Sequence, residues 1–450
     1  MKFKKILIAN RGEIASRIIR TCKRLQIQTV AVYSEADINM PYVKEADESV
    51  LIGPPQVAAS YLNYSKILEL SKGLNVDAIH PGYGFLSENA EFAKVCQENG
   101  ICFIGPSPEV ISLMGSKINS RRKMEEAGVP VVPGNSTGLS SLEEAKMIAD
   151  EIGYPIMLKS SAGGGGIGMS LVSTHQELEK IFDSTRTRAK NYFGDDAVFI
   201  EKYIENSRHI EVQIAADKLG NFLHLFEREC SVQRRNQKVI EESPSPFLSD
   251  LDREELVTAA LKGAKAIGYE NLGTMEFIFD SNSNFYFLEM NTRLQVEHPV
   301  TEAITGLDLV EWQIRIAAGD PLPVSQEEIK MKGNSIECRI YAEDPVRFFP
   351  SPGTIEKLSW PEVDARIDAA IKEGSVVSSY YDPMIAKVIV HGDNRKQAIG
   401  KMESALKQTE IVGIKSNIPI LQDVIQNERF ISGKYSTQLI QLIQKENTLM

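Results

Sequence analysis

Two apolar runs separated by a short polar turn constrain this chain more than any other feature. Met275–Phe279 and Phe285–Met290 flank the polar residues 281–284, a pattern typical of a β-hairpin. A turn that is symmetric about its two central residues places Glu276 directly opposite Glu289. Like charges that face each other destabilise a strand pair, and the apolar aromatic neighbours increase this destabilisation. A divalent cation bound by both carboxylates and shared with substrate phosphates would resolve the conflict.

Beyond this hairpin, polar residues continue at every second position. If the chain stays extended, Asn291, Arg293, Gln295 and Glu297 lie on the same side as Glu289. One strand face would then present carboxylate, amide, guanidinium, amide and carboxylate groups in order. The alternative interpretation is the solvated polar face of an amphipathic strand.

The length and net charge of the chain limit the classes of protein to which it can belong. A chain of 450 residues predicts two to four domains. The net charge of −11 argues against a general nucleic-acid binder and against a membrane-surface protein. No apolar run approaches the length that spans a bilayer. The five cysteines are not spaced as metal ligands are. We therefore expect each to be a small buried side chain in a protein from a reducing compartment.

The first third of the chain alternates strand and helix patterns, which predicts a doubly wound parallel sheet. The predicted strands are Lys5–Ala9, Thr29–Tyr33, Val50–Ile52, Ala78–His80 and Cys102–Ile104, and the predicted helices are Arg11–Leu25, Tyr64–Lys72 and Asn89–Asn99. Ligands are expected beyond the carboxyl ends of such strands, where the loop His80–Ser87 begins.

A small α/β unit with a glycine-rich loop follows. Ser116 can cap a helix whose first turn contains Lys117, and Ser141 and Thr174 begin two capping boxes. A strand over Pro155–Lys159 leads into Ala162-Gly-Gly-Gly-Gly-Ile-Gly-Met169. This loop has neither a P-loop ending nor the dinucleotide spacing. It suits a mobile lid whose backbone N–H groups fold over phosphates, and a plain flexible linker is the alternative.

Two further polar patterns remain. His209 to Gln213 alternates polar and aliphatic residues as a strand does. Residues 228–238 place four cations in an acidic protein, which fits either an anion site or a solvated basic loop. Near the C-terminus a helix from Asp308 ends at Gly319, and Arg339 lies on the polar face of a later strand.

Taken together, seven motifs resemble the biotin carboxylases of the ATP-grasp superfamily. They are Ile8–Ile14, His80–Asn89, Ala162–Gly168, Arg208–Gln213, Gln233–Lys238, Glu289–Glu302 and Tyr380–Lys387. The resemblance runs from Ile6 to about Ile443. It implies an α/β and α+β multi-domain protein: a doubly wound domain over residues 1–115, an ATP-grasp domain over 116–330 with its lid near 131–203, and a mixed α/β C-terminal domain over 331–450.

The resemblance implies that bicarbonate attacks MgATP to give carboxyphosphate, and that carbon dioxide then passes to biotin N1′. Glu297 matches the general base, and Lys238 matches the cation on the γ-phosphate. Arg293, Gln295 and the Val296 backbone match the bicarbonate cradle, completed by Lys238 and Glu297. Arg339 matches the group that stabilises the biotin oxyanion, and Tyr83 borders the biotin pocket.

The nucleotide and metal sites are also implied by the resemblance. Glu276, Glu289 and Asn291 match ligands of two Mg²⁺ or Mn²⁺ ions. The positions that match the ATP site are Lys117, Lys159, Gly163, Gly164, Gly165, Gly166, Met169, Glu201, Lys202, Ile204, His209, Gln233, Asn236 and Ile278.

Three positions depart from the family pattern. Ile167 and Ser170 replace cations that the family usually carries in the lid, and Asn236 replaces a histidine. We therefore expect these replacements to affect nucleotide affinity and lid closure more than the chemistry. The alternatives are a nucleotide-binding regulatory paralogue and another ATP-grasp carboxylate–amine ligase.

The resemblance also implies the partners. The sequence contains no Ala-Met-Lys-Met biotinylation site and no carboxyltransferase pattern. We therefore expect a free-standing subunit that receives biotin on a separate carrier protein and works with carboxyltransferase subunits of an acyl-CoA carboxylase. The resemblance alone implies a homodimer, and a cytoplasmic location is expected. Neither nucleic acid nor membrane is expected as a partner.

Overall fold

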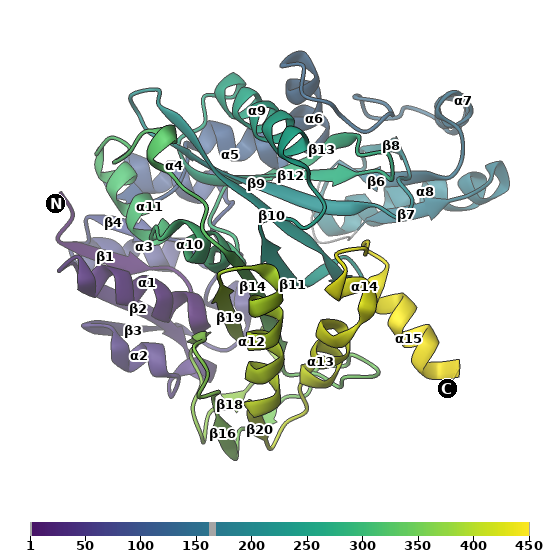
Figure 1. Ribbon diagram of the computed structural model, residues 1–450. Helices are drawn as coiled ribbons and strands as arrows, with labels where there is room; N and C mark the ends of the chain where they lie inside the picture. The colour runs from purple at the N-terminus through teal and green to yellow at the C-terminus, as the bar shows by residue number, and fades with distance from the viewer. Residues whose placement is uncertain (1, 162–167, 450) are drawn as a thin grey trace.

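The N-terminal region folds around a parallel sheet. The computed structural model describes residues 2–161 and 168–449. Its first sheet has the strand order β3-β2-β1-β4-β5, with every pairing parallel, which confirms the predicted doubly wound architecture (Figure 1). The strands are β1 (Lys5–Ile8), β2 (Gln28–Ser34), β3 (Glu48–Gly53), β4 (Ala78–His80) and β5 (Cys102–Phe103). The helices are α1 (Gly12–Arg24), α2 (Pro41–Glu45), α3 (Tyr64–Gly73), α4 (Ala90–Glu98) and α5 (Pro108–Gly115).

Side-chain caps set several helix starts where the sequence predicted them. Asn89 caps α4, and Ser116 caps α6 (Lys117–Glu126) by accepting a hydrogen bond from Asn119 N. Asp308 caps α11 (Leu309–Ala318), which ends at Gly319 in the left-handed region. Lys117 is thus the first residue of its helix, where a cation is unfavourable to the helix dipole.

A small three-stranded unit lies to one side of the molecule (Figure 1). Its sheet has the order β7-β6-β8, and α7 and α8 pack against it. The elements are α7 (Leu142–Ile152), β6 (Ile156–Ser160), β7 (Met169–Val172), α8 (His175–Phe193) and β8 (Val198–Lys202). Ser141 and Thr174 cap their helices as predicted, but the return bonds of the two capping boxes go to the preceding residues, Ser140 and Ser173.

One large sheet joins the rest of the chain. Its eight strands have the order β13-β12-β9-β10-β11-β14-β19-β17 and are all antiparallel. They are β9 (Arg208–Ala216), β10 (Phe222–Arg234), β11 (Gln237–Ser243), β12 (Asn271–Phe279), β13 (Phe285–Asn291), β14 (Asn334–Tyr341), β17 (Arg366–Ala369) and β19 (Met384–Gly392). The pairing of β11 with β14 carries the sheet across the predicted boundary at residue 330.

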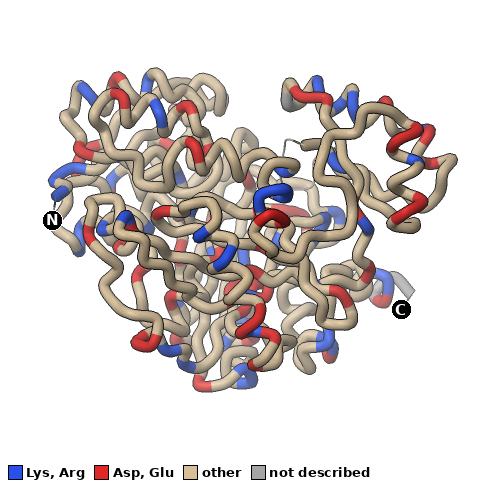
Figure 2. Tube along the Cα trace, turned by 90° about the horizontal axis from the view of Figure 1, so that it is seen from above, with Lys and Arg blue, Asp and Glu red and all other residues tan. Residues whose placement is uncertain are grey.

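Helices and short strand pairs complete the fold. The helices are α9 (Asp250–Ala266), α10 (His298–Thr305), α12 (Arg395–Gln408), α13 (Ile418–Gln426), α14 (Glu428–Ile431) and α15 (Leu439–Leu449). The short pairs join β15 (Gly353–Thr354) to β18 (Val376–Val377) and β16 (Lys357–Ser359) to β20 (Glu410–Val412). Cationic and acidic residues are interspersed along the trace (Figure 2). Within the described residues no helix is long and apolar enough to cross a bilayer.

The register of the central hairpin confirms the facing glutamates, but by a different route. Glu276 pairs with Glu289, whereas Phe277 pairs with Phe287, so Leu288 is an extra residue in β13. The turn is therefore centred on Asn282 alone, and the bulge restores the register that the sequence predicted from a symmetric turn.

Candidate active site

A single large cavity collects most of the predicted site residues. It has a volume of about 1030 Å³ and lies between the N-terminal sheet, the small unit and the large sheet. The described residues predicted for ATP, metal, bicarbonate and biotin all line it, with one exception. Glu297 is completely buried behind this wall. Gly163, Gly164, Gly165, Gly166 and Ile167 lie outside the described residues.

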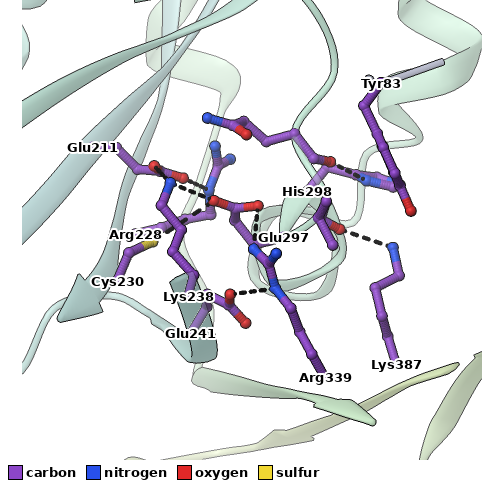
Figure 3. Close-up of polar contacts among 12 residues, drawn as sticks. Tyr83, Glu211, Arg228, Cys230, Lys238, Glu241, Glu297, His298, Arg339 and Lys387 are labelled. Carbon is purple, nitrogen blue, oxygen red and sulfur yellow. Dashed lines mark hydrogen bonds and ion pairs between the residues drawn. The ribbon is translucent and has the colours of Figure 1, made fainter. Parts of the chain in front are cut away.

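The ammonium group of Lys238 is the electrostatic centre of the site (Figure 3). Its Nζ lies 2.5 Å from Glu211 Oε2, 2.8 Å from Glu276 Oε1 and 2.7 Å from Glu297 Oε1. Burial opposes the charged form, but these carboxylates outweigh it and hold the pKa of Lys238 well above its usual value. One fixed cation therefore joins three glutamates that come from three different elements.

Glu297 is held between two cations. Lys238 contacts one carboxylate oxygen, and Nη2 of Arg339 donates to Oε2 at 2.9 Å. Burial alone would raise the pKa of Glu297, but Lys238 and then Arg339 hold it well below its usual value. The carboxylate is thus ionised and can accept a proton, as a general base must.

A further carboxylate holds the other edge of Arg339. Nε of Arg339 lies 2.6 Å from Oε1 of Glu241, which is completely buried. Burial raises the pKa of Glu241 to about 7, although Arg339 opposes the shift. On the neighbouring strand Glu337 faces Glu241, and burial raises its pKa well above the usual value despite the opposing charge of Lys387.

The predicted polar strand face is partly wrong. β13 ends at Asn291, and the chain then turns, so alternation does not continue to Glu297. Three of the four predicted side chains nevertheless converge around Glu276. Asn291 Nδ2 and Gln295 Nε2 each donate to Oε1 of Glu276 at 2.9 Å, while Arg293 donates to Asn291 Oδ1 at 2.7 Å and to Gln295 Oε1 at 2.9 Å. Hydrogen bonds, not strand alternation, bring them together.

The pair Glu276 and Glu289 has the donor set that a hard divalent cation prefers. Within residues 2–161 and 168–449, Glu289 makes no hydrogen bond or ion pair, in contrast to the fully engaged Glu276. Burial and then the charge of Glu276 raise the pKa of Glu289. A partly buried carboxylate without an ion pair in the described ranges, beside a second carboxylate, fits a bound Mg²⁺, with Asn291 supplying an amide oxygen.

Residues 228–238 are a hairpin and not the solvated basic loop that was one interpretation of the sequence. Arg228 is completely buried in β10 and donates to Glu211, Gln213, Thr274 and Thr301. The turn between β10 and β11 contains Arg235 and Asn236, both with positive φ.

The residues predicted to bind the nucleotide include two ion-paired groups, His209 with Glu276 and Lys159 with Glu201. Nε2 of His209 lies 2.9 Å from Glu276, and its Nδ1 contacts Gln233 at 3.0 Å. Burial disfavours a charged imidazole, but Glu276 outweighs it and raises the pKa of His209. The side chains of Lys159 and Glu201 form an ion pair with each other. Burial, opposed by Glu289, lowers the pKa of Lys117.

Comparisons with known proteins match this geometry to one family. Models of the biotin carboxylase N-terminal and C-terminal domains match residues 2–111 and 337–442, and the model of the carbamoyl-phosphate synthase L chain ATP-binding domain matches 116–325. The biotin carboxylase of Halalkalibacterium halodurans is 59% identical over 97% of both chains. This chain belongs to the biotin carboxylase family.

Other relatives are similar to this chain over nearly its full length. Biotin carboxylase 2 of Bacillus subtilis is 57% identical over 97% of this chain and 99% of the relative. A biotin carboxylase from Campylobacter jejuni in a β,γ-ATP complex superimposes with a TM-score of 0.96 at 48% identity, covering 98% and 99% of the two chains. The biotin carboxylase domain dimer of Hydrogenobacter thermophilus 2-oxoglutarate carboxylase, with MgADP, ADP and bicarbonate, has a TM-score of 0.95 at 50% identity, covering 98% and 97%.

Two departures from the biotin carboxylase pattern can be placed. Asn236 lines the cavity and adopts a φ of 66°, a left-handed conformation that Asn tolerates better than most residues. Ser170 lies in β7 opposite Leu158 and is not among the described residues that line the cavity.

Sequence reasoning assigned no individual role to several charged residues that lie at or beside this site. They are Glu13, Glu88, Glu211, Arg228, Glu241, Glu337 and Lys387. A signal was present only in part, because Lys387 is the single charged residue of a largely aliphatic strand, whereas Glu13 lies in a helix and Arg228 lies between two glutamates. Buried positions of this kind are charged only when a partner is provided, and the sequence did not reveal the partners.

Proposed function

We propose that this chain carboxylates biotin in an ATP- and bicarbonate-dependent reaction that proceeds through carboxyphosphate. The observation that carries the proposal is the ionised, completely buried Glu297 held between Lys238 and Arg339, which line a cavity large enough for a nucleotide. A base, a phosphate-binding cation and an oxyanion-binding cation thus lie within one hydrogen-bonded cluster.

In the first step bicarbonate is bound by Arg293, Gln295 and the backbone of Val296. Glu297 removes its proton, and the oxygen attacks the γ-phosphorus while the bond to ADP breaks. Lys238 balances the charge on the transferred phosphoryl group. The donors of Arg293 already point at Asn291 and Gln295, so the cradle is held in place before substrate enters.

In the second step Arg339 stabilises the negative charge on the biotin ureido oxygen as N1′ loses its proton to a base. Carboxyphosphate releases carbon dioxide and phosphate, and N1′ attacks the carbon dioxide. The cavity wall beside Arg339 includes Tyr83, which we assign to the biotin pocket.

Glu276, Glu289 and Asn291 would hold the magnesium ions of MgATP. When bound, Mg²⁺ neutralises charge on the phosphates and orients them for in-line transfer. Lys117, Lys159 and His209 lie on the nucleotide side of the same cavity.

The partners follow from the family. We infer that biotin arrives on a carrier protein, that carboxyltransferase subunits use the product, and that the chain forms a homodimer. The five free cysteines fit a cytoplasmic enzyme.

One assay separates this proposal from its alternatives. ATP hydrolysis is measured with and without bicarbonate, each with and without free biotin. The proposal predicts hydrolysis that depends on bicarbonate and rises with biotin. Hydrolysis that needs an amine or another carboxylate would favour a different ATP-grasp ligase, and ATP binding without turnover would favour a regulatory paralogue.

A further inference from the structure

A buried lysine outside the cavity contacts the backbone next to the proposed base. Lys387 in β19 is completely buried, and its Nζ donates to the carbonyl oxygen of Val296 at 2.8 Å (Figure 3). That carbonyl belongs to the peptide bond between Val296 and Glu297. The orientation of this peptide determines the direction in which the Glu297 side chain leaves the backbone.

The same ammonium group is tied to the N-terminal region. Nζ of Lys387 lies 3.2 Å from Oε1 of Glu13 in α1, and both side chains are buried. The hydroxyl of Tyr83 donates to the same oxygen of Glu13. Asn10 then fixes the Tyr83 loop by donating to the carbonyl oxygens of Pro81 and Tyr83, each at 2.7 Å. A chain of contacts thus runs from the proposed biotin pocket to the backbone of the base.

The large sheet explains why one cation reaches the Glu297 side chain and another reaches the peptide before it. Arg339 in β14 lies directly opposite Lys387 in β19, and Lys387 lies opposite Asp368 in β17. Cross-strand neighbours point to the same face, which here packs on α10 and α1. Arg339 contacts the carboxylate of Glu297, and Lys387 contacts the peptide before it.

We propose that Lys387 and Glu13 are positioning residues that hold the Val296–Glu297 peptide, and with it the base, in the orientation that bicarbonate activation requires. Two of the motifs, Ile8–Ile14 and Tyr380–Lys387, thereby gain a role that the proposed chemistry alone did not give them. The inference rests on the proposed function, because it concerns the same base.

The test compares two cations that each join a buried glutamate to backbone carbonyls, the completely buried Lys387 and the partly buried Arg395. Lys387→Met removes the bond to Val296. Arg395→Met is the control, because Arg395 also joins a buried glutamate, Glu242, to backbone carbonyls, those of Phe430 and Ile431, and none of these lines the cavity. The measured quantities are kcat/KM for bicarbonate, KM for ATP, the melting temperature and deuterium exchange of residues 292–300.

We expect Lys387→Met to lower kcat/KM for bicarbonate by about 100-fold, because small misplacement of a reacting group has effects of that size. Its KM for ATP should stay within about twofold of the parent value. Exchange over 292–300 should rise. Arg395→Met should lower the melting temperature without changing kcat/KM for bicarbonate or exchange over 292–300.

The inference is overturned if Lys387→Met changes only the melting temperature, as the control does, and leaves both kcat/KM for bicarbonate and local exchange at parent values. If Lys387→Met does not fold, Glu13→Gln decides, because it must show the same selective loss to a smaller degree. A parent chain without bicarbonate-dependent turnover would contradict the proposed function, whereas the exchange measurement would still test the hold of Lys387 on this loop.

Discussion

The two ends of the cavity differ in how completely their charges are paired. At the carboxylation end, Glu297 is held by Lys238 and Arg339, and Arg339 is held in turn by Glu241. At the phosphate end, Glu289 lies beside Glu276 without an ion pair among the described residues. The first end is organised before substrate enters, whereas the second leaves a carboxylate for a cation that arrives with the nucleotide. Substitutions at the two ends should therefore fail in different ways.

The largest effect is expected at the paired end. Glu297→Gln should lower bicarbonate-dependent ATP hydrolysis by about a hundred- to ten-thousand-fold, because an amide cannot take a proton. ATP binding should persist, since Glu297 does not line the cavity. Calorimetric titration with a non-hydrolysable ATP analogue checks binding. Hydrolysis at the parent rate would remove Glu297 from the role of base.

Arg339→Ser tests whether Arg339 acts mainly in biotin carboxylation, whereas Glu297 acts in bicarbonate activation. Loss of an oxyanion donor typically costs about 100- to 1000-fold, and biotin carboxylation should fall by that factor. Bicarbonate-dependent hydrolysis without biotin should fall less, and the remaining loss reflects the contact between Arg339 and Glu297. The two activities are measured separately, and an equal loss in both would contradict the assignment.

At the unpaired end, Glu289→Gln should weaken metal activation. We expect the Mg²⁺ concentration for half-maximal activity to rise at least about tenfold, because loss of a residue that only orients a metal ligand already costs about 10- to 100-fold in metal affinity. The melting temperature without metal should not fall, because Gln removes the repulsion from Glu276. A magnesium titration that matches the parent would refute the paired-carboxylate account.

The buried Glu241, which contacts Arg339, predicts how the stability of the fold depends on pH. Burial raises the pKa of Glu241 to about 7, so the folded state holds its proton more tightly than the unfolded state does. Folding is therefore favoured at low pH, and this contribution is lost as the pH rises through about 7. The melting temperature of Glu241→Gln minus that of the parent should therefore be larger at pH 8 than at pH 5. An identical difference at both values would show that Glu241 does not titrate in this range.

The smallest effect is expected in the small unit. Restoring the two family cations as Ile167→Lys with Ser170→Arg should lower KM for ATP and change kcat less. Exposed charge pairs contribute up to about 1 kcal/mol each, which corresponds to roughly fivefold per contact. Because Ser170 does not line the described cavity, Asn236→His is the matched comparison. An unchanged KM in both variants would mean that these positions do not touch the nucleotide.

The sequence predicted the fold more fully than it predicted the site. Apolar periodicity and the capping residues Ser116 and Asp308 located elements within a few residues. The register of Glu276 with Glu289 was also predicted, although the bulge at Leu288 that produces it was not. Local patterns determine these features, so a single sequence is enough to infer them.

Long-range pairing could not be predicted in the same way. The contacts of Lys387 with Val296 and of Arg339 with Glu241 join segments that are far apart in the chain. An isolated charge in an aliphatic strand signals that a partner exists, but sheet order decides which partner it is. The placement of Glu297 behind the cavity wall has the same origin, because three strands and a helix turn must come together to bury it.

The most direct measurement follows labelled carbon from bicarbonate into biotin. The parent chain is incubated with MgATP, ¹⁴C-bicarbonate and free biotin, and acid-labile carboxybiotin is counted against phosphate release, with Glu297→Gln as the blank. The account predicts labelled carboxybiotin that requires ATP, Mg²⁺ and biotin and that is absent from the variant. ATP binding and hydrolysis in the parent without any label on biotin would contradict it.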